Sequence, residues 1–261
     1  MRHVVFNSKG GVGKSSIVCN LAAVAAAEEK RTLIVDLDPQ ANASHYLLGA
    51  RARDAKPNLT DFFEETLGLR LLTSEAETWV HSTPFENLSV IPADIGLAEL
   101  QPKLEARYKI YKLRRLLDRL DEFEAVYLDT PPALNFFTMS ALIGADDCLI
   151  PFDCDEFSRR ALVQLLETVE EIREDHNSAL EVRGIVVNLF QMRARLPQQL
   201  VDELLDENLP LLEPYITASV KMRESHEAHR PLVYLAPSHK LSQQFRDLYK
   251  TLDRPHLAAV S

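Results

Sequence analysis

The sequence NSKGGVGKSS at residues 7–16 decides the fold that we expect for this chain of 261 residues. It nearly matches the phosphate-binding loop pattern G-x-x-x-x-G-K-[ST], in which glycines let the backbone fold around phosphate groups. Two positions depart from the pattern, because Ser8 replaces the first glycine and Lys9 adds a cation that the standard loop does not need. The stretch therefore predicts phosphate binding together with an additional role for Lys9.

The residues around this loop have the order that a phosphate site requires. The apolar run HVVFN at 3–7 predicts a strand, and SSIVCNLAAVAAA at 15–27 predicts a helix that begins beside the loop. The loop glycines allow backbone N–H groups to point inward, and the helix N-terminus adds partial positive charge. Lys14 suits the β- and γ-phosphates, and the Ser15 hydroxyl suits Mg²⁺. The predicted nucleotide-binding residues of the loop are Lys9, Gly10, Gly11, Val12, Gly13, Lys14, Ser15 and Ser16.

Carboxylates follow two further apolar runs. TLIVDLD at 32–38 contains Asp36 and Asp38, and AVYLDTPP at 125–132 contains Asp129. The carboxyl ends of parallel strands meet at one edge of a sheet, where α/β proteins bind their ligands. An acid at that edge can hold Mg²⁺ directly or through water. The predicted metal ligands are Ser15, Asp38 and Asp129.

Apolar runs alternate with helical stretches along the chain. This alternation predicts an α/β fold, a single-domain P-loop NTPase with a mostly parallel, twisted β-sheet and helices on both faces. No linker divides the sequence, so we expect one domain over 1–261, with 252–261 as a flexible tail because Pro255 stops a helix. Further strands are expected at 88–93, 148–152, 183–190 and 231–236, and helices at about 97–120, 158–174 and 197–208.

Composition excludes several classes of protein. Hydrophobic residues make up 46% of the chain and charged residues 26%, which is ordinary for a globular protein. No apolar run approaches the roughly 18 residues of a membrane span. The phosphate loop begins too near the N-terminus for a signal peptide, and the three cysteines form no CxxC pair. These features favour the reducing cytoplasm.

The net charge of −10 is unfavourable for nucleic-acid binding, so the local distribution of charge matters. Residues 103–119 hold seven Lys or Arg against Glu105 and Asp118. Their apolar residues fall near helical spacing, so we expect a continuous helix whose buried face includes Tyr108 and Tyr111. The exposed basic face is either a solvated surface or a docking site for an acidic partner or for DNA.

Several segments of the chain resemble the ParA/MinD family of ATPases, whose deviant Walker A motif carries an extra lysine. KGGVGKS at 9–15 resembles that motif, and VDLDPQANAS at 35–44 resembles the family's DxDPQGNAT segment, with Ala41 where glycine is usual. The likeness covers nearly the whole chain and is weakest at 50–87. The other similar segments are the Walker B region at 127–152 and the C-terminal blocks at 184–200 and 216–239.

The resemblance implies a slow ATPase that forms a homodimer with two ATP molecules between its subunits. Lys9 matches the lysine that contacts the nucleotide of the partner subunit, and Asp38 matches the acid that orients the attacking water. Asn188 aligns with an asparagine that contacts adenine. The resemblance thus gives Lys9, Lys14 and Asp38 as catalytic residues, and ATP and Mg²⁺ as cofactors.

The C-terminal end distinguishes branches of this family. MinD-like members end in a basic amphipathic helix that binds lipid, whereas FRDLYKTLDRPHLAAVS at 245–261 contains Pro255 and two acids, Asp247 and Asp253. The chain therefore resembles the small ParA type, and a McdA-like, cargo-positioning member is one candidate. We expect no membrane binding.

The small ParA type implies the partners and the location. Such a protein binds nonspecific DNA, is associated with the nucleoid in the cytoplasm, and works with a ParB-like or cargo-adaptor protein that stimulates hydrolysis. The cargo would be a plasmid, a chromosome, or a protein assembly such as a carboxysome or chemoreceptor cluster. By the same resemblance, the DNA-binding residues are Arg193, Arg195, Lys221 and Arg223.

Two alternative functions use the same phosphate loop. One is a MinD-like positioning ATPase associated with the membrane. The other is a metabolic ATP-dependent ligase of the dethiobiotin-synthetase type, which would need a pocket for a carboxylate substrate and no lysine acting on a partner subunit. Lys9 and the DPQ segment favour the ParA type over the ligase.

Overall fold

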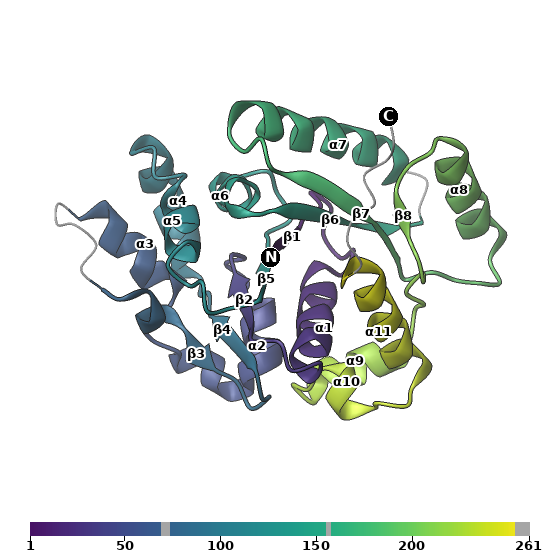
Figure 1. Cartoon of the computed structure of the whole chain (residues 1–261), viewed down its shortest axis with the longest axis horizontal. Coiled ribbons are helices and arrows are strands. Elements are labelled where there is room, and N and C mark those ends of the chain that lie inside the picture. The colour runs from purple at the N-terminus through teal and green to yellow at the C-terminus, as the bar shows by residue number, and fades with distance from the viewer. Residues whose placement is uncertain (69–73, 155–157, 254–261) are drawn as a thin grey trace.

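The computed structural model of the chain describes residues 1–68, 74–154 and 158–253 (Figure 1). These residues form an eight-stranded sheet in the order β3-β4-β2-β5-β1-β6-β7-β8. All neighbouring strands pair in parallel except β3, which pairs antiparallel with β4 at one edge. The strands are β1 (Arg2–Val5), β2 (Thr32–Asp36), β3 (His81–Ser82), β4 (Leu88–Ile91), β5 (Ala125–Asp129), β6 (Asp147–Asp153), β7 (Glu181–Asn188) and β8 (Leu211–Leu212).

Helices cover both faces of the sheet, as Figure 1 shows with α6 and α7 on one side and α1 and α11 on the other. Alternate residues of a strand supply the two cores: Val4 packs in one hydrophobic cluster and Val5 in the other. Sequence therefore predicted the fold class correctly. The helices are α1 (Lys14–Ala27), α2 (Asn42–Leu48), α3 (Leu59–Leu67), α4 (Gly96–Ala106), α5 (Lys112–Leu117), α6 (Phe136–Gly144), α7 (Ser158–Asp175), α8 (Arg195–Asp206), α9 (Val220–Glu227), α10 (Leu232–Leu235) and α11 (Lys240–Asp253).

Strand order places the phosphate loop at the centre of the sheet. β1 lies between β5 and β6, and the loop that leaves it runs directly into α1. Asp36 at the end of β2 is in register with Asp129 at the end of β5. The carboxyl ends of three neighbouring strands therefore meet beside the N-terminus of α1, at the edge where open α/β sheets bind ligands.

One expected strand is a helix, and two short strands were not expected. Residues 231–236, expected as a strand, contain the short helix α10, in which Leu232 is buried and its N–H donates to Asn20 Oδ1 at 2.9 Å. A short apolar run does not distinguish a strand from a buried helical turn. The short strands β3 and β8 were not expected, because two-residue strands leave no periodic signal.

The expected helix at 97–120 is divided into two. α4 ends at Ala106, Tyr108 adopts a left-handed conformation with φ 52°, and α5 begins at Lys112. The break lets Leu104 and Leu113 enter the same hydrophobic cluster, whereas Tyr108 and Tyr111, expected to be buried, are exposed.

The C-terminal end differs in part from the expected flexible tail at 252–261. Leu252 and Asp253 belong to α11, and Leu252 is buried against the cluster that also contains α1. Residues 254–261 lie outside the described residues. Among the helices that the structure describes, none has the length and apolar character needed to cross a membrane.

Asn177 connects the end of α7 to the end of α6. Its buried amide donates to Leu142 O at 3.0 Å and to Ala145 O at 2.8 Å. Asn177→Ala removes both donors, so we expect the free energy of unfolding, measured in urea, to fall by about 1–3 kcal/mol. ATP affinity should not change, because these contacts lie away from the phosphate loop. Ser178→Ala, at the exposed neighbouring position, is the control, and equal stability of the two variants would contradict the assignment.

Candidate functional site

The phosphate loop is shaped by backbone conformations that favour glycine. Gly11 and Gly13 have φ values of 79° and 89°, in the left-handed region. A Cβ atom on Gly13 would lie 2.3 Å from Asn188 Nδ2, so a larger residue there is excluded by contact as well as by φ. Gly13 O accepts from Ile17 N at 2.9 Å, which begins the hydrogen bonding of α1. The loop therefore presents its amides and the N-terminus of α1 to one space.

Lys14 reaches back across the loop. Its ammonium donates to Asn7 O at 2.9 Å and to Lys9 O at 3.0 Å. Burial lowers the pKa of Lys14, and the nearby carboxylates of Asp129 and Asp38 act in the opposite direction. Its charge is thus held inside the loop, at the position where a phosphate would approach.

The two acids of the DLD segment have different surroundings. Asp36 is fully buried and accepts from the Ser44 backbone N–H, the Ser44 hydroxyl and the Asp38 N–H. Burial raises the pKa of Asp36 to about 6, against the effect of these hydrogen bonds. Asp38 lines the pocket, and one of its oxygens accepts from Gln40 N at 2.9 Å. Asp36 therefore shapes the turn after β2, while Asp38 faces the ligand space.

Asp129 is the acid whose surroundings fit a cation. It is fully buried, and neither carboxylate oxygen has a hydrogen-bond partner among the described residues. Burial raises the pKa of Asp129 well above its usual range, and the carboxyl of Asp36 adds to this effect, while Ser15 and Lys14 oppose it. An unpartnered buried carboxylate beside a serine hydroxyl has the chemistry of a Mg²⁺ site.

The protein groups alone do not form a complete metal cage. Within the described residues, no group of three or more His, Cys, Asp or Glu side chains is arranged to hold a metal ion. This fits a magnesium ion that takes one or two protein ligands and completes its shell with phosphate and water. Ser15 and Asp129 are the residues that would hold it, with Asp38 nearby.

Lys9 points to an acid of its own chain. Its ammonium donates to both oxygens of Asp153, at 2.7 and 2.9 Å, although 144 residues separate the two. Asp153 ends β6, so the contact joins the outer part of the phosphate loop to the neighbouring strand. Both side chains are partly exposed, at 33% for Lys9 and 21% for Asp153, so solvent and other ligands can compete for this ion pair.

Asn188 contacts the loop. Its buried amide donates to Val12 O at 2.8 Å, and it occupies the space beside Gly13. Asn188 is absent from the residues that line the pocket in front of the loop. The adenine contact expected for it stays a prediction, and the structure gives this residue a role in supporting the phosphate cradle.

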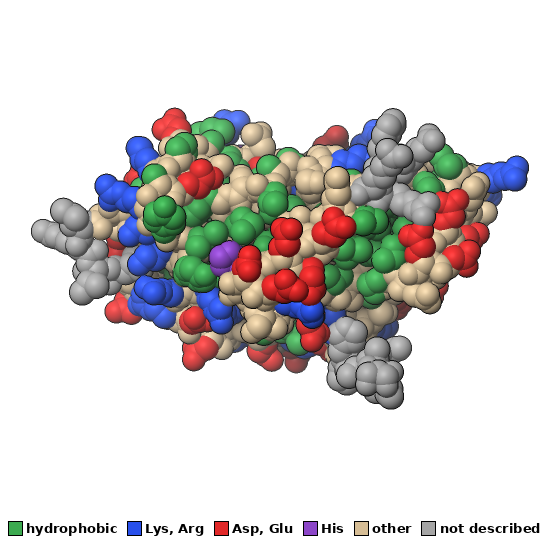
Figure 2. Space-filling model, turned by 90° about the horizontal axis from the view of Figure 1, so that it is seen from above, with side chains coloured by type: hydrophobic (Ala, Val, Ile, Leu, Met, Phe, Trp, Pro, Cys, Tyr) green, Lys and Arg blue, Asp and Glu red, His purple; other side chains and the backbone are tan. Residues whose placement is uncertain are grey.

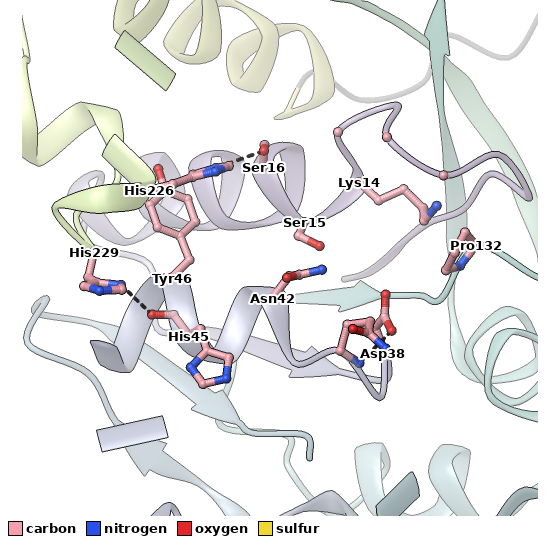
Figure 3. A pocket seen from close by; sticks show the side chains of 14 residues that line it. Lys14, Ser15, Ser16, Asp38, Asn42, His45, Tyr46, Pro132, His226 and His229 are labelled. Atoms are coloured by element: carbon pink, nitrogen blue, oxygen red, sulfur yellow. Dashed lines mark hydrogen bonds between the residues drawn. The ribbon is translucent and has the colours of Figure 1, made fainter. Parts of the chain in front are cut away.

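A pocket of about 490 Å³ lies in front of the loop. Figure 3 shows Lys14, Ser15 and Asp38 around one side of it, while His226 and His229 border the other side and come from the C-terminal part of the chain. Ser16 Oγ lies 3.0 Å from His226 Nε2. The lining residues are Gly10, Gly11, Gly13, Lys14, Ser15, Ser16, Asp38, Gln40, Asn42, His45, Tyr46, Pro132, His226 and His229.

Sequence reasoning missed some of these residues. Asp153 carries the same signal that identified Asp129, an acid at the end of an apolar strand, and could have been found by it. Tyr46 and His226 could not, because 180 residues separate them and only the packing of α2 against α9 brings their rings to 4.5 Å.

The four proposed DNA-binding cations fall on two adjoining segments. Arg193 and Arg195 follow β7, while Lys221 and Arg223 lie on α9. Backbone bonds between Phe190 and the 216–218 segment hold the two regions together. Lys221 forms an ion pair with Glu224, which reduces the positive charge that Lys221 can offer to a DNA phosphate. The exposed Lys240, which sequence did not indicate, lines a shallow hollow with Arg193.

A central strand, a left-handed glycine loop, a helix N-terminus and acids at neighbouring strand ends define a P-loop nucleoside triphosphatase. A family model described as an AAA domain matches residues 2–182. The chromosome partitioning protein ParA of Myxococcus xanthus is 32% identical over 232 residues, which are 88% of this chain and 79% of that protein. The chain belongs to the ParA/MinD family of ATPases.

Solved structures have the same fold. Apo McdA of Cyanothece superposes with a TM-score of 0.83 at 22% identity, covering 96% of this chain and 98% of that one. Cobyrinic acid a,c-diamide synthase of Mycobacterium smegmatis, with a bound ATP analogue and magnesium, gives 0.80 at 25% identity and covers 95% and 92%. These likenesses extend over nearly the whole chain.

The unpartnered carboxylate of Asp129 leads to a test of the metal site. Asp129→Asn removes a buried charge, so we expect the melting temperature of the ligand-free protein to stay equal or to rise. The additional stabilisation that ATP gives with Mg²⁺ rather than with EDTA should be lost, because a ligand stabilises the folded state more the more tightly it binds. A thermal-shift titration measures both effects.

The control is Asp147→Asn, the same change at a buried acid that pairs with His3 at the opposite end of the sheet. This variant should lose stability and keep its response to Mg²⁺. If Asp129→Asn keeps the full magnesium increment, then Asp129 does not hold the ion.

Proposed function

We propose that the chain is a ParA-type ATPase whose two subunits enclose two ATP molecules, and whose dimer binds DNA without sequence specificity. A ParB-like or cargo-adaptor protein stimulates hydrolysis, and the cycle positions or segregates a cargo in the nucleoid-containing cytoplasm. The observation that carries this proposal is Lys9, whose ammonium lies outside its own phosphate cradle.

The loop residues bind and orient ATP in this proposal. The backbone amides from Gly10 to Ser16 surround the phosphates, and Lys14 leaves its two carbonyl partners to bind the β- and γ-phosphates. Bound Mg²⁺, held by Ser15 and Asp129, would neutralise developing phosphate charge. Asp38 orients the attacking water, because its carboxylate faces the pocket and its backbone is fixed by Asp36.

Lys9 acts on the partner's nucleotide. Lys14 occupies the space toward the cradle and donates a hydrogen bond to the Lys9 carbonyl, so the Lys9 side chain extends in a different direction, toward Asp153. A phosphate of the second subunit offers more negative charge than one carboxylate. Dimerisation with ATP therefore exchanges a partly exposed ion pair within the chain for a phosphate contact between chains.

DNA binding needs both subunits. Arg193, Arg195, Arg223 and Lys240 are exposed and form no ion pair with the described residues, but the acids of α9 lie beside them. One subunit offers few cations in a chain of net charge −10. A dimer doubles the number of phosphates neutralised, which makes DNA affinity dependent on ATP. The likeness to ParA and McdA supports a cargo-positioning role, with the carboxysome as one candidate cargo.

Asp38→Ala tests the role of the water-orienting acid. Loss of this carboxylate should reduce phosphate release by at least about tenfold, since positioned general bases contribute roughly 10²–10⁴-fold. Binding of a fluorescent ATP analogue should remain, and light scattering should show an accumulated ATP-bound dimer. Hydrolysis at the wild-type rate would mean that Asp38 has been given the wrong role.

Lys9→Ala tests the contact between subunits. We expect ATP-dependent dimerisation, followed by analytical ultracentrifugation, to be abolished, while the monomer still binds ATP through Lys14. Lys30→Ala removes a partly exposed lysine paired with Asp253 at the far end of the sheet, and this control should dimerise normally. Normal dimerisation of the Lys9 variant would contradict the proposed dimer that encloses two ATP molecules. It would favour a ligase in which no lysine acts on the nucleotide of a partner subunit.

Arg193→Ala combined with Lys240→Ala tests the DNA surface. The native chain should bind an arbitrary duplex with ATP and only weakly with ADP. With ATP, the double variant should bind the duplex more weakly than the native chain. Its slope of log affinity against log salt should be smaller by about 2–4, since four contacts are lost per dimer. Arg51→Ala with Arg53→Ala removes two exposed cations on a different surface and is the matched control. Equal affinity with ADP would contradict the proposal.

A further inference from the structure

The break between α4 and α5 exposes aromatic side chains. Tyr108 is 89% exposed and Tyr111 is 42% exposed, although both lie in a segment whose leucines are buried. The Tyr111 hydroxyl lies 3.0 Å from His176 Nδ1, so this ring is fixed against the end of α7. A tyrosine exposed to this degree on a structured turn is a candidate anchor for a partner.

Tyr108 borders an apolar groove of about 400 Å³, and Tyr111 contacts His176, which also lines it. One wall is the α4–α5 turn with Tyr108 and Ile110, and the other is the start of α6 with Phe136 and Met139. Leu134, half exposed, extends the apolar surface. The lining residues are Glu105, Tyr108, Ile110, Leu134, Asn135, Phe136, Met139 and His176.

Three cations lie in or just after the turn that forms one wall of this groove. Lys109 lies between the two lining residues of the turn, and Lys112 and Arg115 follow it. None of the three forms an ion pair with the described residues. The pKa of Lys112 is lowered by burial and by repulsion from Arg115 and Lys109. Positive charge is thus concentrated here without an ion-pair partner among the described residues, in a chain whose net charge is −10.

The opposite side of the groove is acidic. Figure 2 shows hydrophobic side chains between basic ones on the left of the view, where α4 and α5 lie, and a group of acidic side chains near the middle, over α7. An acidic segment would therefore place its carboxylates toward α4 and α5. DNA fits this surface poorly, because Glu105 lines the groove and α7 would repel the phosphates.

The groove lies beside the nucleotide site. Pro132 lines the ATP pocket, and Leu134 and Asn135, two and three residues later, line the groove. The Asn135 side chain accepts from Phe137 N and Thr138 N and so caps α6. A ligand in the groove therefore contacts the same short segment that follows Asp129 and borders the nucleotide.

We propose that the groove between the α4–α5 turn and α6 binds an acidic peptide segment of a partner protein, with an aromatic or aliphatic side chain as its anchor. The assignment to a partner rests on the proposed function; the groove itself does not. The apolar walls supply burial for the anchor, and the unpaired Lys109, Lys112 and Arg115 select acidic flanking residues.

A random 12-residue peptide library displayed on phage, panned on the full chain with ATP and Mg²⁺, tests this inference. We expect enrichment of peptides that combine an aromatic or aliphatic residue with several Asp or Glu. Fluorescence anisotropy of an enriched synthetic peptide should show at least tenfold weaker binding to the Lys109→Glu, Lys112→Glu variant and to Tyr108→Ala. Arg51→Glu with Arg53→Glu makes the same charge change elsewhere and should bind normally.

Other outcomes overturn the inference. These are no enrichment, enriched peptides without acidic residues, or enriched peptides that bind the groove variants as tightly as the native chain. Loss of duplex DNA binding in the Lys109→Glu, Lys112→Glu variant without peptide enrichment would assign the surface to DNA. Loss of self-association, seen by ultracentrifugation without ATP, would assign it to a second copy. Phosphate release and ATP-dependent dimerisation are measured in parallel, so failure of the peptide site is distinguishable from failure of the proposed function.

Discussion

The site depends on the parallel pairing of β1 between β5 and β6. This pairing fixes where the loop after Val5 starts, and the left-handed glycines then carry the chain into α1 within a few residues. The amides, the helix N-terminus and the Lys14 ammonium converge only because the strand and the helix are held at this separation. Asp129 of β5 reaches the same place through its register with Val5 of β1, and Asp36 of β2 through its register with Asp129.

Burial of like charges gives this site its chemical character. Asp36 and Asp129 are fully buried, and burial raises the pKa of both. The carboxyl of Asp36 further raises the pKa of Asp129, while the Lys14 ammonium lowers it. Asp36 is satisfied by Ser44 and Asp38, but Asp129 is not satisfied by any described group. A folded chain that leaves a carboxylate in this condition favours the binding of a cation, which links metal and nucleotide binding to stability.

Contacts from distant segments support the loop. Asn188 at the end of β7 donates to Val12, and Asp153 at the end of β6 binds Lys9. The loop is therefore connected to two successive strands on one side, while Lys14 lies near the carboxylates of Asp129 and Asp38 on the other. The same loop also lies beside Pro132, so the segment after β5 borders the pocket together with the loop.

The sequence by itself determined the local parts of the protein. Glycine spacing, the strand before the loop, the helix after it and the acids at strand ends are patterns within short windows, so the fold class, Lys14, Ser15 and the roles open to Asp38 and Asp129 could be predicted. Tertiary structure decided what depends on distant contacts. The pairing of Lys9 with Asp153 and of Val12 with Asn188 joins residues 144 and 176 positions apart. The break at Tyr108, which exposes two tyrosines beside a groove, follows from the need to bury Leu104 and Leu113 in one core, and helical periodicity alone carries no information about that requirement.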